Sequence, residues 1–418
     1  MNVAIYIARK LSLKSERRGR ISPGVATAVI GVALALAIMI LSIAVIRGFK
    51  KEITGKITGF SAPITLYAPM DSETPSLTSG IHLTDTLQTI IAEAAPDSRA
   101  DLIIRQPAIF KTDSDFQGII LKGLPQGEAW KFYGENLTEG ALPSDTAEAY
   151  PNQVVISART AAALGLRTGD RVPTHFLSDN SLRTRGLTVS GIFDSHFSDF
   201  DQTVALTPLA MLQRLNRVDS ITGTSVEIRN LPLEAIEPTL ITISDLAIQS
   251  TIKNPDNPLI FRAESVTQTN HQYFSWLDLL DTNVAVIIIL MACVAGFTLI
   301  SSLFILILER VNTIGLLKAL GSSNRLVRSI FIYMALRLVL AGMIAGNLLS
   351  LLLIWVQDRY RVMGLDPEAY YINFVPVDIS VSDILIVNIS AIVIAALVLI
   401  LPSHLIATLS PARTLRFE

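Results

Sequence analysis

Four long apolar stretches interrupt this sequence of 418 residues. The first, residues 25–46, contains 22 consecutive positions without a charge, and three more follow near the carboxyl end, at 283–308, 330–356 and 384–408. About 20 apolar residues are enough for an α-helix to cross the hydrocarbon core of a membrane. The pattern therefore predicts a polytopic α-helical membrane protein with four transmembrane helices, arranged as one plus three around a polar region at 47–282.

The first apolar stretch is expected to remain in the mature chain. A secretory signal peptide has a shorter apolar region, of about 7–15 residues, and ends at a small-residue cleavage site. This stretch is longer and is followed by Arg47-Gly48-Phe49-Lys50-Lys51. Residues 1–24 carry six basic side chains against one acid and are compatible with an amino-terminal helix lying at the membrane interface.

The polar region at 47–282 has the pattern of a large extracytoplasmic α+β domain. Short runs rich in β-branched residues and bounded by Gly, Pro or Asp predict strands, and Thr, Ser or Pro ahead of periodic segments predicts helices. A cluster of Gly, Glu, Asn and Pro near 134–143 predicts a division into two subdomains. Strands are expected at 62–67, 102–111, 118–123, 153–156, 186–193, 203–206 and 224–228, and helices at 84–95, 157–164 and 208–215.

Charge is distributed unevenly and predicts the orientation in the membrane. Residues 52–281 carry 16 basic and 28 acidic residues, whereas the rest of the chain has a net charge of +10. The basic residues concentrate at 1–24, in the segment 309–329 and in the tail 409–418, which the positive-inside rule places in the cytoplasm. Both termini are therefore predicted to be cytoplasmic.

Two further observations bear on this orientation. The segment 357–383 has two basic and five acidic residues, as expected of a loop on the outer side. Arg47, Lys50 and Lys51 run against the rule, but the six basic residues of the amino-terminal segment outnumber them.

Composition supports a membrane protein and narrows its chemistry. Hydrophobic residues make up 50% of the chain and charged residues 17%, where a soluble domain has about a quarter of its residues charged. The single cysteine, Cys293, excludes an intrachain disulfide and a cysteine-based metal site. No phosphate-binding loop is present, since Gly55-Lys56 is followed by Ile57 and lacks the upstream glycine. Any ATP chemistry must therefore come from a partner chain.

A patterned segment at 309–321 separates the second and third apolar stretches. As a helix it presents one face with Ile314, Leu317 and Lys318 and a neighbouring face with Leu316 and Leu320. Such a segment is too short for a domain and more regular than a turn. It predicts a cytoplasmic surface on which another protein acts.

Two glycines fit this interpretation of the segment. Gly315 permits close approach of another surface, and Gly321 is suited to end the helix. The alternative is a tight cytoplasmic turn whose basic residues only follow the positive-inside rule.

Three motifs resemble the MacB and FtsX-like family of ABC-transporter permeases. The segment at 309–321, with Glu309-Arg310 followed after three residues by Ile314-Gly315-Leu316-Leu317-Lys318-Ala319-Leu320-Gly321, resembles the family's coupling segment. The tail at 410–418 is similar to the family's terminal pattern of Pro-Ala followed by Leu-Arg-aromatic-Glu. Residues 31–52 are similar to the first span of lipoprotein-releasing (Lol-type) permeases. Together with the one-plus-three layout, the resemblance covers the whole chain.

The resemblance implies roles for residues at two places in the chain. The residues implied to couple to an ATPase are Glu309, Arg310, Ile314, Gly315, Leu317, Lys318, Ala319 and Gly321, and those of the carboxyl-terminal motif are Pro411, Leu415, Arg416 and Glu418.

The resemblance also implies a function. Such permeases reside in the bacterial inner membrane, pair with a second permease subunit as a homodimer or heterodimer, and dock a pair of ABC ATPase subunits that bind ATP and Mg²⁺. ATP-driven closure moves the periplasmic domains, so the chain itself is expected to be a non-catalytic subunit without a cofactor. The implied cargo is a lipoprotein or another lipid-anchored molecule, extracted from the membrane lipid and in some systems passed to a periplasmic chaperone. Nothing in the sequence points to nucleic acid.

Acyl chains of such a cargo would favour an apolar surface near the outer ends of the first two spans, because each buried CH₂ contributes about 0.8 kcal/mol. A small-residue motif at 342–346 favours close helix packing either within the chain or between two subunits. The residues predicted to face the cargo are Leu41, Val45, Ile46, Val284 and Ile288.

Two stretches of the polar region qualify the assignment. Where the chaperone-binding member of a Lol pair projects a long hooked loop, this chain offers only the short stretch 172–187, which places direct chaperone capture in doubt. The one enzyme-like cluster, at 194–201, alternates Asp and His so that its ligands fall on opposite faces of a strand. A polar connection between two strands is therefore favoured over a metal site, and no catalytic residue is assigned.

Two other functions remain open. The same architecture serves cell-division regulators that act on wall hydrolases and efflux permeases for peptides or macrolides. A membrane-anchored enzyme would instead require activity in the isolated polar domain, and the sequence offers no catalytic constellation for it.

Overall fold

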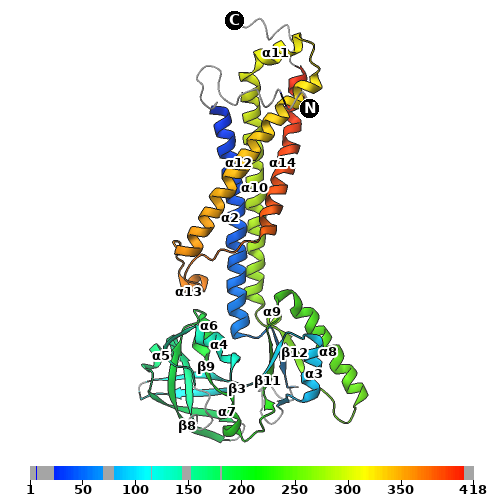
Figure 1. Cartoon of the computed structure of the whole chain (residues 1–418). Coiled ribbons are helices and arrows are strands. Elements are labelled where there is room, and N and C mark those ends of the chain that lie inside the picture. The colour runs from blue at the N-terminus through cyan, green and yellow to red at the C-terminus, as the bar shows by residue number, and fades with distance from the viewer. Residues whose placement is uncertain are drawn as a thin grey trace. The chain divides into compact units, whose positions relative to one another are not determined.

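The computed structural model describes residues 6, 23–68, 80–113, 115–143, 152–178 and 181–408. The chain divides into two compact units. The helical unit contains Met1–Glu52, Trp276–Leu365 and Phe374–Glu418, and the α+β unit contains Ile53–Ser275 and Asp366–Asn373. Figure 1 shows long helices in the first unit, and strands with shorter helices in the second.

The described residues contain four helices that are long and apolar enough to span a membrane. Each contains one of the predicted apolar stretches, which confirms the predicted fold class of one helix, a large α+β region and three helices. All four run past the apolar positions at one or both ends. They are α2 (Pro23–Phe60), α10 (His271–Glu309), α12 (Asn324–Tyr360) and α14 (Val381–Thr408).

Glycines allow α12 to pack closely against α2. A Cβ atom added at Gly346 would lie 2.7 Å from the carbonyl oxygen of Ala33, and one added at Gly342 would lie 2.8 Å from the Cβ of Val32. Both distances are well inside van der Waals contact, so only glycine permits this separation of the two backbones. The small-residue motif at 342–346 therefore packs within the chain.

Apolar side chains and one pair of amides complete the packing of the helical unit. Asn347 on α12 and Asn388 on α14 exchange two side-chain hydrogen bonds, of 2.8 and 3.0 Å. Because a polar group in an apolar surrounding costs free energy unless it is paired, this exchange fixes which faces of the two helices meet. One apolar cluster beside these amides consists of Val32, Leu36, Met39, Ile40, Leu299, Val339, Met343, Val387 and Ala395.

The basic residues of α2 that run against the positive-inside rule are paired with acids of the same unit. Arg47 Nη1 lies 2.6 Å from Asp383 Oδ2, and Lys51 Nζ lies 3.3 Å from Asp378 Oδ2. Lys50 pairs with Asp281 and lies 3.8 Å from Asp278. Each exception to the rule is thus neutralised locally.

The first part of the α+β unit is a βαββαβ arrangement like that of ferredoxin-like folds. Its strands pair antiparallel in the order fourth, first, third, second, and its two helices contact each other. The elements are β1 (Ile64–Tyr67), α3 (Asp85–Ala94), β3 (Arg99–Lys111), β11 (Ser225–Arg229), α8 (Ile236–Lys253) and β12 (Arg262–Ser265).

The second part is inserted between β3 and β11. Its strands continue the same sheet in the order β3-β4-β9-β6-β8-β5, while β7 pairs with both β3 and β8. The strands are β4 (Phe116–Leu124), β5 (Leu137–Gly140), β6 (Gln153–Ser157), β7 (Arg171–Ser178), β8 (Ser181–Phe193) and β9 (Val204–Pro208). The helices are α4 (Lys131–Glu135), α5 (Ala158–Leu164), α6 (Ser198–Thr203) and α7 (Leu209–Asn216).

Short elements lie in the connections between the longer ones. Strands β2 and β10 form a separate two-stranded sheet. The short elements are β2 (Ile81–His82), β10 (Thr222–Gly223), α9 (Val266–Thr269), α11 (Val311–Ala319) and α13 (Pro367–Tyr370).

The change from the first part of the sheet to the second lies within β3. Its residues 99–103 pair with β11, and its residues 104–111 pair with β4. The division predicted near 134–143 falls elsewhere, because β5 occupies residues 137–140 and pairs with β8. All of the strands and helices predicted between residues 62 and 228 are present. The elements that were not predicted are β7, α8 and β12 and the shorter β2, β5, β10, α4, α6, α9 and α13.

The close contact between α2 and α12 predicts opposite effects for two glycine-to-alanine changes. Gly346→Ala forces a methyl group onto the backbone of Ala33 and should destabilise the protein by about 1–3 kcal/mol. Gly55→Ala, in α2 with no atom within 4 Å of the added methyl, should be neutral or stabilising by up to about 1 kcal/mol. Thermal unfolding of the full chain in detergent measures both. A Gly346→Ala protein as stable as the Gly55→Ala protein would contradict this packing.

Candidate functional site

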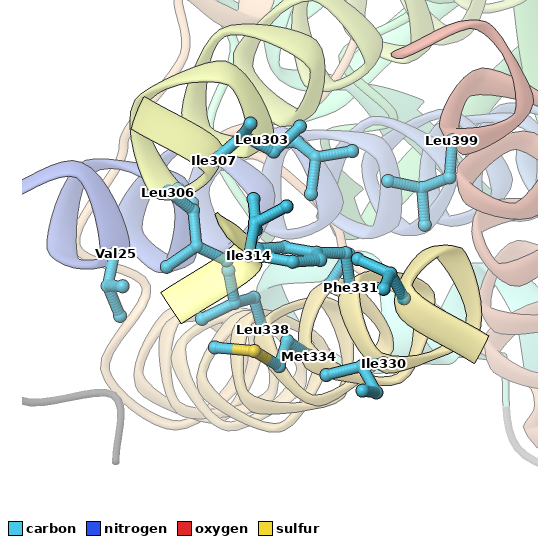
Figure 2. Packing of buried hydrophobic residues seen from close by; sticks show 13 residues of the cluster. Val25, Leu303, Leu306, Ile307, Ile314, Ile330, Phe331, Met334, Leu338 and Leu399 are labelled. Carbon is cyan, nitrogen blue, oxygen red and sulfur yellow. The ribbon is translucent and has the colours of Figure 1, made fainter. Parts of the chain in front are cut away.

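The segment predicted to act as a coupling surface folds as α11, between α10 and α12. Ile314 of this helix is almost fully buried and belongs to an apolar cluster with residues of all four long helices. Figure 2 shows Ile314 among side chains of that cluster. The cluster includes Val25, Leu303, Leu306, Ile307, Val327, Ile330, Phe331, Met334, Leu338 and Leu399.

The two predicted faces of α11 have different environments. On the first, Ile314 is buried, Leu317 packs against the same cluster and Lys318 is half-buried; Gly315 is buried as well. On the neighbouring face, Leu316 is 58% exposed and Leu320 is 76% exposed. The first face therefore holds α11 on the helical unit, and the second leaves two leucines available to another chain.

Gly321 ends α11 in the way its position predicts. Its φ angle of +85° lies in the left-handed region. Its N–H donates to the carbonyl of Lys318, and the N–H of Ser322 donates to that of Leu317, both at 3.0 Å. These two bonds form the Schellman motif, which satisfies carbonyls left unpaired at a helix end.

A helix cap on the other side of this turn completes the connection. The Ser323 hydroxyl accepts a hydrogen bond from the N–H of Leu326 and so caps α12. α11 is therefore joined to α12 by a turn whose backbone groups are paired on both sides.

A second structured site lies within the α+β unit, at the carboxyl end of α2. The carbonyl oxygen of Gly59 accepts a hydrogen bond from Arg229 Nη1, and that of Phe60 accepts one from Lys122 Nζ, both at 3.0 Å. The last carbonyls of a helix lack partners within the helix and carry partial negative charge. Two cations from separate strands therefore cap the end of α2.

Glu227 on β11 holds these cations in place. It is fully buried, and its carboxylate lies 2.8 Å from Lys122 Nζ, 2.6 Å from Arg229 Nη2 and 2.9 Å from Arg105 Nη2. Burial lowers the pKa of Lys122 to about 7. Burial also opposes ionisation of Glu227, but the charges of Lys122, Arg229 and Arg105 outweigh it and hold the pKa of Glu227 well below its usual value. Each charge in this buried cluster depends on its neighbours.

Aromatic rings surround Phe60, the last residue of α2. Its ring centroid lies 4.3 Å from that of Phe200, 4.7 Å from that of Phe132 and 5.8 Å from that of Phe197. A Cβ atom at Gly59 would fall within 2.6 Å of the Phe132 ring. The end of α2 is thus held by apolar packing as well as by charge.

Residues 366–373, from the connection between α12 and α14, also bind this end of α2. Lys56 of α2 donates a hydrogen bond of 2.9 Å to the carbonyl of Tyr371. The Tyr371 ring stacks on Phe197, with centroids 4.6 Å apart and planes inclined by 15°. Asn373 contacts His196 at 3.2 Å. We call the set of contacts made by Glu227, Lys122, Arg229, the Phe60 aromatics and Tyr371 the α2 anchor.

The residues predicted to face an acyl chain are half-buried. Three of them lie on α2 and two on α10, and Ile288 packs against the apolar cluster of the helical unit. The residues concerned are Leu41, Val45, Ile46, Val284 and Ile288.

The carboxyl-terminal motif, Pro411, Leu415, Arg416 and Glu418, lies outside the described residues.

The Asp and His cluster at 194–201 is the connection between β8 and β9, as predicted. Ser195 Oγ donates a 2.5 Å hydrogen bond to the buried Asp201, and burial raises the pKa of Asp201 to about 6. His196 contacts a different carboxylate, with its Nδ1 atom 3.1 Å from Asp194 Oδ1. Within the described part of the chain, no three His, Cys, Asp or Glu side chains are placed to hold a metal ion.

The stretch 172–187 forms part of a β-hairpin. Residues 171–178 of β7 pair in register with residues 181–188 of β8, which leaves two residues between the strands. The hairpin thus has no room for a long loop.

Sequence reasoning missed the α2 anchor. Lys122 and Glu227 lie in strands that were predicted, but a charged residue in a strand usually marks a solvent-facing position. The sequence offered one signal: a charged residue with apolar neighbours, in a strand that lies in the interior of the sheet. Their separation of 105 positions along the chain hid the pairing of Lys122 with Glu227.

Comparison with known proteins gives matches along most of the chain. A family model for the MacB-like periplasmic core domain matches residues 25–259, and one for the FtsX-like permease carboxyl-terminal region matches residues 285–411. The lipoprotein-releasing system transmembrane protein LolC of Xylella fastidiosa (strain Temecula1) is 23% identical, over 100% of this chain and 99% of the relative. LolC of Neisseria meningitidis is 23% identical and LolE of Haemophilus influenzae 20% identical, each over 99% of both chains.

The α2 anchor predicts that removing its central charge is costly. Glu227→Gln leaves buried cations without a full counter-charge and should destabilise the α+β unit by about 3–5 kcal/mol. Glu264→Gln provides the matched control, because Glu264 lies on the same face of the sheet but forms a partly exposed pair with Arg262, and it should cost less than about 1 kcal/mol. Limited proteolysis of the full chain against urea concentration measures both. Equal stability of the two variants would contradict the anchor.

Proposed function

This chain belongs to the family of permeases with a MacB-like periplasmic core domain and an FtsX-like carboxyl-terminal region, and from that premise we propose that it is the membrane subunit of an ABC transporter that releases lipoproteins from the bacterial inner membrane. ATP and Mg²⁺ are bound by a pair of separate ATPase subunits, and a second permease subunit completes the complex. The chain itself performs no chemistry.

The exposed face of α11 is the observation that carries the proposal. A chain without a phosphate-binding loop needs an energy-supplying partner. Leu316 and Leu320 offer that partner an apolar contact on a helix fixed by Ile314 and by the turn at Gly321. A force applied to α11 therefore reaches the helical unit through packed side chains and hydrogen-bonded turns. Glu309 and Ala319 are exposed and border the contact, Lys318 is half-buried, and Arg310 and Gly315 are buried.

The orientation follows from charge and from the family. Basic residues of the α11 segment and of both ends of the chain favour the cytoplasmic side, so both termini are cytoplasmic in this proposal. The α+β unit is then periplasmic, where the matched core domain is placed by its description.

In this proposal, the α2 anchor transmits movement of α2 to the strands of the α+β unit. A helix that is capped by buried cations and enclosed by aromatic rings resists slipping against the strands that hold it. Movement of α2 therefore carries the strands of the α+β unit with it.

The cargo is inferred from the relatives. The relatives that align with this chain along its whole length are lipoprotein-releasing system transmembrane proteins. The acyl chains of the cargo would contact the outer parts of α2 and α10, through Leu41, Val45, Ile46, Val284 and Ile288. Because the hairpin of β7 and β8 projects no long loop, the proposal does not include capture of a chaperone by that hairpin.

The exposed leucines provide the test. Leu316→Ser combined with Leu320→Ser removes two apolar contacts, each contributing about 1.5–3 kcal/mol when buried, and should lower copurification of the ATPase more than tenfold. ATP-dependent lipoprotein release from proteoliposomes should fall with it. The control is Leu233→Ser. Leu233 lies in the α+β unit and is 44% exposed, and this variant should retain both ATPase copurification and lipoprotein release. Normal ATPase recovery and normal release with the double variant would refute the proposed docking site.

A further inference from the structure

Helix α8 of the α+β unit exposes an apolar stripe. Ile241 is 58% exposed, Ile248 57% and Ile252 73%. The spacings of seven and four residues place the three side chains on one line along the helix. On the opposite side of the helix, Ile236, Ile243 and Ala247 are buried in the domain core. The stripe therefore points directly away from the core.

Such a stripe is unusual for a surface helix. α3, the helix beside it, buries Leu87, Ile90 and Ile91 and exposes mainly polar or small side chains. Three large β-branched side chains aligned in water keep apolar surface exposed that a partner would cover, and contiguous exposed apolar surface marks interaction sites.

Charges on one flank of the stripe indicate which partner covers it. Asp245 and Lys253 are both exposed, on the same side of the stripe, and lie four residues before and after Gln249. If a second α8 packs antiparallel about a two-fold axis at Gln249, each Asp245 lies level with Lys253 of the second copy. A two-fold contact requires such self-complementarity, because the same patch meets itself.

We infer that the α8 stripe is a contact between the α+β units of two copies of this chain, with the two α8 helices antiparallel and the axis near Gln249. The inference rests on the proposed function only in that the permease works as a pair. Ile248 of both copies lies beside the axis, and the two Asp245–Lys253 pairs fix the register by opposing charge.

The size of the stripe is consistent with a local contact rather than a self-sufficient dimer. A stable interface buries about 1,200–2,000 Å² in total, more than three isoleucines on each copy supply. The stripe therefore aligns two α+β units that the rest of the complex already brings together.

Cysteine cross-linking in membranes tests the contact. The background is Cys293→Ser, which removes the chain's only cysteine. Gln249→Cys should then give a cross-linked homodimer with a short bismaleimide. Thr242→Cys is exposed on the same flank but lies ~10 Å along the helix from the axis, so its two copies would be ~20 Å apart and should not cross-link.

Charge exchange tests the register. In the Gln249→Cys background, Asp245→Lys alone or Lys253→Asp alone places like charges opposite each other and should lower the homodimer yield roughly fivefold. The two changes together restore opposite charges and should restore the yield. Three homodimer yields would overturn the inference: none with Gln249→Cys, the same yield with Thr242→Cys as with Gln249→Cys, or no recovery when both charges are exchanged. Cross-linking of Gln249→Cys only to a different chain would also overturn it.

The same membranes separate this inference from the proposed function. Copurification of an ATPase without cross-linking at Gln249→Cys would refute the α8 contact alone. Cross-linking at Gln249→Cys in a chain that recovers no ATPase would refute the transporter and leave the contact in place.

Discussion

The α2 anchor depends on the ion pairs that the buried carboxylate of Glu227 forms. This carboxylate accepts hydrogen bonds from three cations inside the α+β unit, and two of them reach the last carbonyls of α2. Removing charges from water costs several kcal/mol per ion, which only a fully paired arrangement offsets. The cluster therefore favours a fully paired geometry, and the paired geometry observed here includes the end of a membrane-spanning helix. A cluster that held only the strands together would not need to point its cations at a helix terminus.

Other contacts hold the long helices of the helical unit together. α2 continues without a break from Pro23 to Phe60, through residues of both units. Gly342 and Gly346 bring α12 against α2, and the exchange between Asn347 and Asn388 fixes α12 against α14. α11 is fastened to this bundle by Ile314 and joined to α12 by a capped turn. Each of these connections rests on buried apolar packing, close backbone contact or paired hydrogen bonds.

Local patterns predicted much of this architecture. The four spans follow from uncharged runs of membrane length, and the strands at 118–123 and 153–156 follow from short β-branched runs between turn residues. The helix stop at Gly321 was predictable because only glycine enters the left-handed region without strain. These features depend on neighbouring residues, so a single sequence contains the information.

Features set by distant residues were not predictable in the same way. The two faces of α11 are equally apolar in sequence, and only the cluster around Phe331 and Leu306 determines that Ile314 turns inward and Leu316 outward. Strand β7 was missed because its pairing with β3 and β8 depends on tertiary context. The division of the α+β unit within β3 follows from the order of the strands, which local patterns do not specify.

The most direct measurement is the distance between a spin label on α8 and one at the end of α10, in the assembled complex in nanodiscs. Thr242→Cys and Leu308→Cys, both exposed, supply the label sites in the Cys293→Ser background. If ATP binding by the ATPase docked at α11 moves α2 and its anchored strands, the distance distribution must differ between the nucleotide-free and the vanadate-trapped states. The Leu316→Ser, Leu320→Ser variant must lose that difference. An identical distribution in both states, in a complex that still hydrolyses ATP and releases lipoprotein, would contradict transmission through α2.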